Sequence, residues 1–567
     1  MTRSFFYLFS LIILLVSCSG SRSLHHIDPF HYSIQKKGTG NHGAVVSAHP
    51  LASETGVAIL KQGGNAVDAA IATQLALAVV YPAAGNIGGG GFTVMRLANG
   101  STITIDYREK APGKAHRDMY LDAQGNAQTN LSQNGHLSAG VPGAVAGIFK
   151  CMPYAKLPFK KLIQPAIDLA EKGFVITEAE AGSLNRSQND FIKYNTITPV
   201  FVKPGGWKAG DTLIQKDLAN TLKRIRDNGQ KGFYEGETAR LIVEEMQRAN
   251  GIISYEDLKQ YEAKEREPVI FDYKGYKIIT MPLPSSGGVL LPQMMHMIED
   301  QPIKQYGFQT AESVQLITEI ERRAYADRAK FLGDVDFYKV PVEQLTSKAY
   351  AKERMKDYQP KIAGSSTVIG AGIIPESEET THFSVCDKEG NAVSVTTTLN
   401  GGYGSSTVVG GAGFFLNNEM DDFSIKPGVP NMYGAVGADA NAIAPGKRML
   451  SSMTPTIVLK NDLPYLVLGT PGGTTITTSV FQTLINILEF DMSVDDAVNK
   501  PKFHHQWLPD QIFVEPAFPQ TVREQLQQMG YTIKQRGSIG RTEVIKIDGG
   551  IIEAVADGRG DDAAAVY

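Results

Sequence analysis

The sequence has few cysteines, little net charge and no apolar run long enough to span a bilayer. Three cysteines in 567 residues exclude a fold that depends on a disulfide framework. Lysine and arginine total 55 against 59 acidic residues, a formal net charge of −4 with no basic stripe, so a nucleic-acid partner has no electrostatic support. Hydrophobic residues make up 42% and charged residues 20%, which excludes a disordered chain and predicts a large buried core.

Several signatures of hydrolases and cofactor enzymes are also missing. The sequence has no G-x-S-x-G nucleophile elbow, no H-E-x-x-H zinc motif and no G-x-x-x-x-G-K-[ST] phosphate loop. The closely spaced cysteine and histidine pattern of a structural zinc site is absent, and the eleven histidines are scattered. We therefore expect neither a metal ion nor a cofactor.

The N-terminus has the features of an export signal. The apolar run 5–16 is too short for a membrane span but has the length of a signal-peptide core. It ends in Leu-Val-Ser-Cys18, which resembles the bacterial lipobox, so residues 1–17 are expected to be removed and Cys18 to carry lipid. An ordinary signal peptide cut nearby is the alternative. Residues 18–40 are polar and irregular, and we expect a tether there. We then expect the protein to be periplasmic or at the cell surface, anchored by lipid to a bacterial membrane, with Ser19 and Gly20 after the cysteine favouring the outer one.

The other two cysteines are Cys151 and Cys386. In an oxidising compartment they either pair with each other or remain as buried free thiols, and the sequence does not separate these alternatives.

The hydrophobic pattern predicts a layered α/β body with sheet strands from both halves of the chain. Helices are expected over most of residues 140–360, and residues 365–379 are polar and lack periodicity. Strands are expected at 44–48, 92–97, 102–107, 381–386, 392–399, 456–459 and 466–468. Helices are expected at 51–80 with a break at Gly63-Gly64, and at 159–172, 216–227, 235–249, 311–331, 474–488 and 494–498.

The last third of the chain is rich in threonine, serine, glycine and asparagine, and its centre is Glu379-Thr380. An internal threonine is a poor nucleophile because its hydroxyl is barely ionised. If the bond before Thr380 is broken, the freed α-amine, with a pKa near 8, becomes a general base beside the hydroxyl. Taken alone, Thr380 is better interpreted as an ordinary strand threonine, so the prediction of a nucleophile depends on the residues that accompany it.

Ordered motifs across most of the chain supply that context. From residue 43 to residue 567 the sequence resembles the γ-glutamyltranspeptidase family of N-terminal-nucleophile hydrolases. The motifs that carry this resemblance are Gly64-Asn-Ala-Val-Asp-Ala-Ala, Gly85-Asn-Ile-Gly-Gly-Gly-Gly-Phe, Asp106-Tyr-Arg-Glu-Lys-Ala-Pro, Glu379-Thr-Thr-His-Phe-Ser, Leu416-Asn-Asn-Glu-Met-Asp-Asp-Phe, Leu450-Ser-Ser-Met-Thr-Pro-Thr, Gly469-Thr-Pro-Gly-Gly and Phe503-His-His-Gln-Trp-Leu-Pro.

The resemblance implies a four-layer αββα sandwich and a chain that cuts itself between Glu379 and Thr380. Residues 41–379 would form a large subunit and residues 380–567 a small one, intertwined in one body. Thr380 would then attack the γ-carbonyl of a γ-glutamyl amide, with glutathione the expected donor. The resulting ester would pass its acyl group to water or to an amino acid or dipeptide.

The resemblance also implies roles for individual residues. Thr398 would orient the nucleophile, and the backbone amides of Gly472 and Gly473 would hold the oxyanion. The donor is expected to be bound by two sets of side chains, Arg108, Ser451 and Ser452 for its α-carboxylate and Asn400, Glu419 and Asp422 for its α-ammonium. Tyr433, in a Pro- and Gly-rich segment at 426–437, would cover the bound glutamyl group as part of a lid.

Two other functions are compatible with parts of this pattern. A relative that acts on other acyl amides, similar to a cephalosporin acylase, would share the nucleophile but would not need Arg108, Ser451 and Ser452. An unprocessed surface lipoprotein that only binds γ-glutamyl peptides would not need Thr380.

Overall fold

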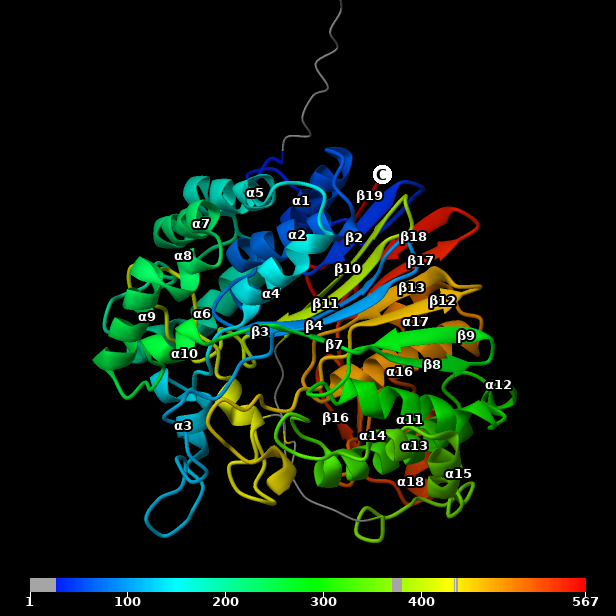
Figure 1. Cartoon of the computed structure of the whole chain (residues 1–567). Coiled ribbons are helices and arrows are strands. Elements are labelled where there is room, and N and C mark those ends of the chain that lie inside the picture. The colour runs from blue at the N-terminus through cyan, green and yellow to red at the C-terminus, as the bar shows by residue number, and fades with distance from the viewer. Residues whose placement is uncertain (1–26, 370–379, 433, 435–436) are drawn as a thin grey trace, which may run out of the picture.

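Two seven-stranded antiparallel sheets form the centre of the molecule (Figure 1). The computed structural model describes residues 27–369, 380–432, 434 and 437–567. The first sheet has the order β1 (Lys37–Gly40), β18 (Ile551–Val555), β17 (Glu543–Asp548), β13 (Leu463–Gly469), β12 (Thr456–Lys460), β9 (Tyr276–Thr280) and β8 (Val269–Tyr273). The second has the order β19 (Ala563–Val566), β2 (Gly43–Ser47), β10 (Thr381–Asp387), β11 (Ala392–Thr398), β3 (Gly90–Arg96), β4 (Thr102–Asp106) and β7 (Lys264–Arg266).

The two sheets stack on each other, and helices cover both outer faces (Figure 1). Side chains from facing strands, among them Val46, Phe92, Ile457 and Val467, fill the space between the sheets. The outer face of the second sheet packs on α1 (Pro50–Lys61), α2 (Ala66–Val80) and α4 (Ala144–Cys151). The outer face of the first packs on α11 (Gly287–Glu299), α16 (Thr475–Leu488) and α17 (Val494–Asn499). This is the expected four-layer αββα sandwich.

Further helices surround these layers, and two small sheets complete the described structure. The additional helices are α3 (Thr129–Gln133), α5 (Phe159–Lys172), α6 (Glu178–Lys193), α7 (Lys216–Asn228), α8 (Lys231–Tyr234), α9 (Gly236–Arg248), α10 (Tyr255–Lys259), α12 (Ile303–Tyr306), α13 (Ala311–Phe331), α14 (Val342–Leu345), α15 (Lys348–Arg354) and α18 (Gln520–Gln528). One small sheet joins β14 (Phe503–His504), β15 (Ile512–Val514) and β16 (Ile533–Gln535), and the other joins β5 (Phe174–Val175) and β6 (Thr212–Leu213).

The predicted broken helix at 51–80 is confirmed as α1 and α2. Gly63, between them, has φ +91°, a conformation that glycine adopts without strain. A capping box of Asn65 and Asp68 then starts α2, and every residue of α2 is buried. The helix shows no polar face because it lies between the second sheet and α5.

Two predictions about local structure were incomplete or wrong. The stretch 140–360 is mostly helical, as expected, but it also contains the hairpin of β8 and β9, which turns through Lys274 and Gly275 with positive φ at both residues. The expected tether reaches into the fold, because β1 pairs with β18. Just before β1, the Lys36 ammonium donates to the backbone oxygens of Asp557, Gly560 and Asp562 at 2.6–2.9 Å.

Both sheets combine strands from before and after residue 380. In the second sheet, β10 lies between β2 and β11, and β19 at the C-terminus pairs with β2. Among the residues the structure describes, no helix is long and apolar enough to cross a membrane. Cys151 and Cys386 are free and buried, so of the two alternatives for these cysteines the unpaired one is found.

Candidate active site

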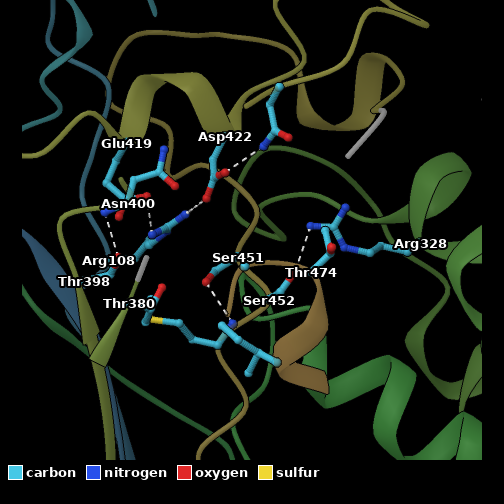
Figure 2. Close-up of a pocket in the computed structure, with 14 residues that line it drawn as sticks. Arg108, Arg328, Thr380, Thr398, Asn400, Glu419, Asp422, Ser451, Ser452 and Thr474 are labelled. Carbon is cyan, nitrogen blue, oxygen red and sulfur yellow. Dashed lines mark hydrogen bonds and ion pairs between the residues drawn. The ribbon is translucent and has the colours of Figure 1, made fainter. Parts of the chain in front are cut away.

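Thr380 lies at the end of the second sheet, immediately before β10. Only 4% of the surface of this residue is exposed. The β10–β11 ladder pairs Thr381 with Thr397, which puts Thr398 at the same end of the sheet as Thr380. Both threonines line a small, partly enclosed pocket (Figure 2). Its other lining residues are Arg108, Arg328, Asn400, Glu419, Asp422, Asn431, Ser451, Ser452, Met453, Gly473, Thr474 and Ile476.

Arg108 follows β4 and is almost completely buried, with 1% of its surface exposed. Its Nη1 lies 2.5 Å from a carboxylate oxygen of Glu419, and its Nη2 pairs with Asp422. Nε donates to the backbone oxygen of Met449 at 3.3 Å. The sequence assigned Arg108 to the carboxylate end of the donor and the two acids to its ammonium end. In this structure Arg108 forms ion pairs with those two acids, Glu419 and Asp422.

A third carboxyl group, that of Glu109, lies 3.7 Å from the Arg108 guanidinium and is completely buried. Burial raises the pKa of Glu109 to about 8, and Arg108 opposes that rise. Burial likewise raises the pKa of Glu419 well above its usual range, again opposed by Arg108. Three acids thus share one guanidinium, which suits the binding of a further positive charge such as an α-ammonium.

Asn400 and the two serines form other walls of the pocket. Asn400 has φ +75°, donates its backbone N–H to Thr398 Oγ1 at 2.7 Å, and donates its side-chain amide to the backbone oxygen of Asn418 at 3.0 Å. The Ser451 hydroxyl oxygen accepts from the backbone N–H of Met453, and that of Ser452 accepts from Arg328, both at 3.2 Å.

Gly472 and Gly473 form the turn that leads from β13 into α16. Their φ values are +134° and +53°, in the region that favours glycine. A Cβ added at Gly472 would lie 2.4 Å from Thr475 Oγ1, whose hydroxyl donates to the Gly472 backbone oxygen. The N-terminal end of α16 faces the pocket through Gly473 and Thr474, so the positive end of the helix dipole favours a negative charge there.

Tyr433 lies outside the described residues, as do Glu379 and Cys18. The residues just before Tyr433 are held against the site. Asn431 donates its side-chain amide to Asp422 at 2.8 Å, and the backbone N–H of Met432 donates to Asp421 at 2.6 Å.

The structure brings together Thr380 with the other predicted residues, Thr398, Asn400, Arg108, Glu419, Asp422, Ser451, Ser452 and Gly473, and Gly472 adjoins them. Sequence reasoning missed Arg328, Glu109, Asn431 and Thr474. Arg328 offered a signal, because it lies on α13, where 17 of the 18 residues from Ala311 to Arg328 are buried although several of them are charged. A charged side chain on a buried helix face needs partners, and one partner of Arg328, Ser452, lies in the pocket.

Comparison with known proteins gives one consistent result. The gamma-glutamyltranspeptidase family model matches residues 52–567. The glutathione hydrolase proenzyme of Escherichia coli K12 is 44% identical over 562 residues, covering 97% of both chains. The crystal structure of Helicobacter pylori gamma-glutamyltranspeptidase is 45% identical with a TM-score of 0.56, covering 59% of this chain and 95% of that one. A cephalosporin acylase from Bacillus halodurans aligns with a TM-score of 0.82 at 27% identity, covering 96% and 99%.

Proposed function

Because the chain belongs to the gamma-glutamyltranspeptidase family, we propose that it is a glutathione hydrolase and γ-glutamyltransferase that works through Thr380. The observation that carries this proposal is the pocket itself. It gathers a threonine, one buried arginine paired with two acids, and two serines from segments up to several hundred residues apart in the sequence (Figure 2).

The proposed maturation is a cut of the chain's own backbone. The Thr380 hydroxyl attacks the carbonyl carbon of residue 379, the acyl group moves from nitrogen to oxygen, and water hydrolyses the ester. The product is a new N-terminus at Thr380 and two subunits, 18–379 and 380–567. The E. coli relative is named as a proenzyme, which supports a processed precursor.

In the proposed reaction the freed α-amine of Thr380 takes the proton of its own hydroxyl, whose oxygen attacks the γ-carbonyl of the donor. The amides of Gly472 and Gly473, at the N-terminal end of α16, stabilise the oxyanion. The leaving amine receives the proton as the C–N bond breaks, and a γ-glutamyl ester remains on Thr380. Water or an acceptor amine then attacks that ester, which gives hydrolysis or transfer.

The proposed donor pocket needs both signs of charge, because a γ-glutamyl group carries an α-carboxylate and an α-ammonium. Arg108 with Ser451 and Ser452 suits the carboxylate, and Glu419, Asp422 and Asn400 suit the ammonium. When a donor binds, its own ion pairs replace part of the internal pairing of Arg108 with the two acids. The completely buried guanidinium therefore never lies in the pocket without a counter-charge.

Action on other acyl amides is a second candidate, favoured by the high structural similarity to a cephalosporin acylase. Its identity of 27% is well below the 44% shared with the glutathione hydrolase proenzyme. An acyl group without an α-amino acid end would leave three buried carboxyl groups and Arg108 without a substrate partner. These side chains favour the γ-glutamyl donor.

The segment around Tyr433 is proposed to act as a lid over the bound glutamyl group. Asn431 and Met432, which the site holds through Asp422 and Asp421, support this placement of the segment beside the pocket. Tyr433→Ala should admit water and raise the ratio of hydrolysis to transfer. An unchanged ratio in that variant would remove the lid from the account.

Export and anchoring are also proposed, on the apolar run 5–16 and the lipobox-like ending at Cys18. The mature protein would be periplasmic or at the cell surface, held by lipid on Cys18. Membrane fractionation of cells that make the wild-type protein or Cys18→Ala tests this: the wild type should sediment with membranes and the variant should not. Equal distribution of the two proteins would rule out the anchor.

The enzyme assay that tests the function uses γ-glutamyl p-nitroanilide with and without a dipeptide acceptor. The wild-type protein should release p-nitroaniline and, with acceptor, form γ-glutamyl dipeptide. Glutaryl p-nitroanilide, which lacks the ammonium, and 4-aminobutyryl p-nitroanilide, which lacks the carboxylate, should be much poorer donors. Preference for either of these over the γ-glutamyl compound would favour the acylase alternative.

A further inference from the structure

We propose that Arg328 is a positioning residue for donor recognition: it directs the Ser452 hydroxyl towards the donor's α-carboxylate and adds a second positive charge behind it. This inference rests on the proposed function. Arg328 lies near the C-terminal end of α13, and 8% of its surface is exposed. Figure 2 shows it approaching the pocket from the side opposite Arg108, with Ser451 and Ser452 between the two arginines.

Two N–H groups set the direction in which the Ser451 and Ser452 hydroxyls point. The oxygen of Ser452 accepts a hydrogen bond from Arg328 Nη2 at 3.2 Å, and that of Ser451 accepts from the backbone N–H of Met453 at 3.2 Å. A hydroxyl has a single proton, and a neighbouring N–H that donates to its oxygen turns that proton away. Both serines are thereby set to donate, which suits a carboxylate and not a cation.

The charges around the pocket explain why the donor's α-carboxylate needs a second arginine. Arg108 is already paired with Glu419 and Asp422 and lies close to Glu109, so that side of the pocket has more acidic than basic groups. An entering α-carboxylate therefore needs positive charge from another direction. Burial raises the pKa of Asp422, and Arg108 and, more weakly, Arg328 oppose this rise, so the field of Arg328 extends across the pocket.

A hydrogen bond on the side away from the pocket holds Arg328 in place. Its Nε donates to the hydroxyl oxygen of Ser286 at 3.2 Å, at the residue that precedes α11. The guanidinium thus joins Ser286, N-terminal to residue 380, to Ser452, C-terminal to it. Only the Ser452 half faces the pocket, so the two halves can be tested separately.

The experiment compares Arg328→Gln, Arg328→Lys and Ser286→Ala with the wild type, each checked for complete processing by intact mass. The KM for γ-glutamyl p-nitroanilide and the inhibition constants of L-glutamate and 4-aminobutyrate are measured. Arg328→Gln should raise the KM and the L-glutamate constant about 10- to 100-fold while kcat changes less than about threefold. The constant of 4-aminobutyrate, which has no α-carboxylate, should not change. Arg328→Lys should fall between. Ser286→Ala, which removes only the hydrogen bond that holds the guanidinium, should raise the same two constants less than Arg328→Gln does.

A double-mutant cycle then tests whether Arg328 acts through Ser452. If it does, Arg328→Gln with Ser452→Ala should be little worse than the poorer single variant. Equal effects on L-glutamate and 4-aminobutyrate, or a loss confined to kcat, would overturn the proposal and leave a structural role for Arg328. If Arg328→Gln does not mature, an Arg328→Lys variant with unchanged KM and L-glutamate constant would overturn it as well. A wild-type protein that fails to cleave the γ-glutamyl anilide would instead overturn the proposed function.

Discussion

Replacement of Arg108 by methionine removes the positive charge from the buried cluster that Arg108 forms with three acids. Methionine keeps much of the side-chain volume but leaves Glu419, Asp422 and Glu109 without their guanidinium. Breaking a buried ion pair by removing one partner costs about 3 to 5 kcal/mol. With an unfolding entropy of about 2.1 cal/mol/K per residue, a body of this size has a total of about 1 kcal/mol/K, so the cost corresponds to a fall in Tm of about 3 to 5 °C.

The effect of this replacement should depend on pH. Without Arg108 the pKa values of the buried carboxyl groups rise further above their unfolded values. Stability is then retained at low pH and lost as the pH rises, so the variant should be more destabilised at pH 8 than at pH 6. A second replacement, Glu419→Gln, removes one of the stranded acids and should recover part of the lost stability.

Thermal unfolding of the processed proteins at both pH values measures these differences, and the kinetics of γ-glutamyl p-nitroanilide cleavage are recorded alongside. The double variant should recover stability but not donor affinity, because the carboxylate clamp is still missing. Arg108→Met with a wild-type Tm at pH 8 would refute the reasoning, since the ion pairs would then contribute nothing to the folded state.

Three further predictions concern the oxyanion turn, a buried histidine and the acids of the donor pocket. Gly472→Ala should lower kcat at least 100-fold and lower the Tm. The added Cβ would clash with Thr475 Oγ1, and the backbone φ of +134° is unfavourable for alanine. An alanine variant with wild-type kcat would exclude the turn as an oxyanion site. Burial lowers the pKa of His382 to about 3, so the stability that the neutral imidazole contributes is present above pH 6.5 and is lost as the pH falls. His382→Gln should therefore lose about 2 kcal/mol less unfolding free energy than the wild type between pH 7 and pH 5. An identical loss in the two proteins would contradict the burial argument. Burial raises the pKa values of Glu109 and Glu419, so these carboxyl groups gain negative charge as the pH rises from 6 to 8. L-glutamate, which carries an ammonium, should therefore inhibit more tightly at the higher pH, while glutarate, which has none, should not. Parallel pH profiles of the two inhibition constants would refute this.

The sequence predicted local structure best where the pattern was strong. The sequences of β10 and β11 are rich in β-branched residues, and the sequence of α2 is apolar. Nearly every side chain in these elements is buried, so the residue pattern alone indicates the secondary structure. The hairpin of β8 and β9 was missed because its turn, Lys274-Gly275, joins two short strands inside a helical region. Its place at the sheet edge depends on the pairing of β9 with β12, whose residues lie 176 to 184 positions later in the sequence.

The site could be predicted in part. Thr380, Arg108 and the acids were found from ordered motifs, and the pocket gathers them. The pairing of Arg108 with Glu419 and Asp422 could not be predicted, because it joins residues more than 300 positions apart and depends on complete burial. Arg328 was missed for the same reason, since its partners Ser286 and Ser452 belong to different loops.

The central claim is that the chain cuts itself before Thr380 and then uses that residue as its nucleophile. Intact mass and N-terminal sequencing of the purified wild-type protein and of Thr380→Ala test it directly. The account predicts two chains in the wild type, about two-thirds and one-third of the mature mass, with the smaller one beginning Thr-Thr-His-Phe-Ser, and a single uncut chain in the variant. A wild-type protein that stays as one chain, or a variant that is still cut at the same bond, would contradict it.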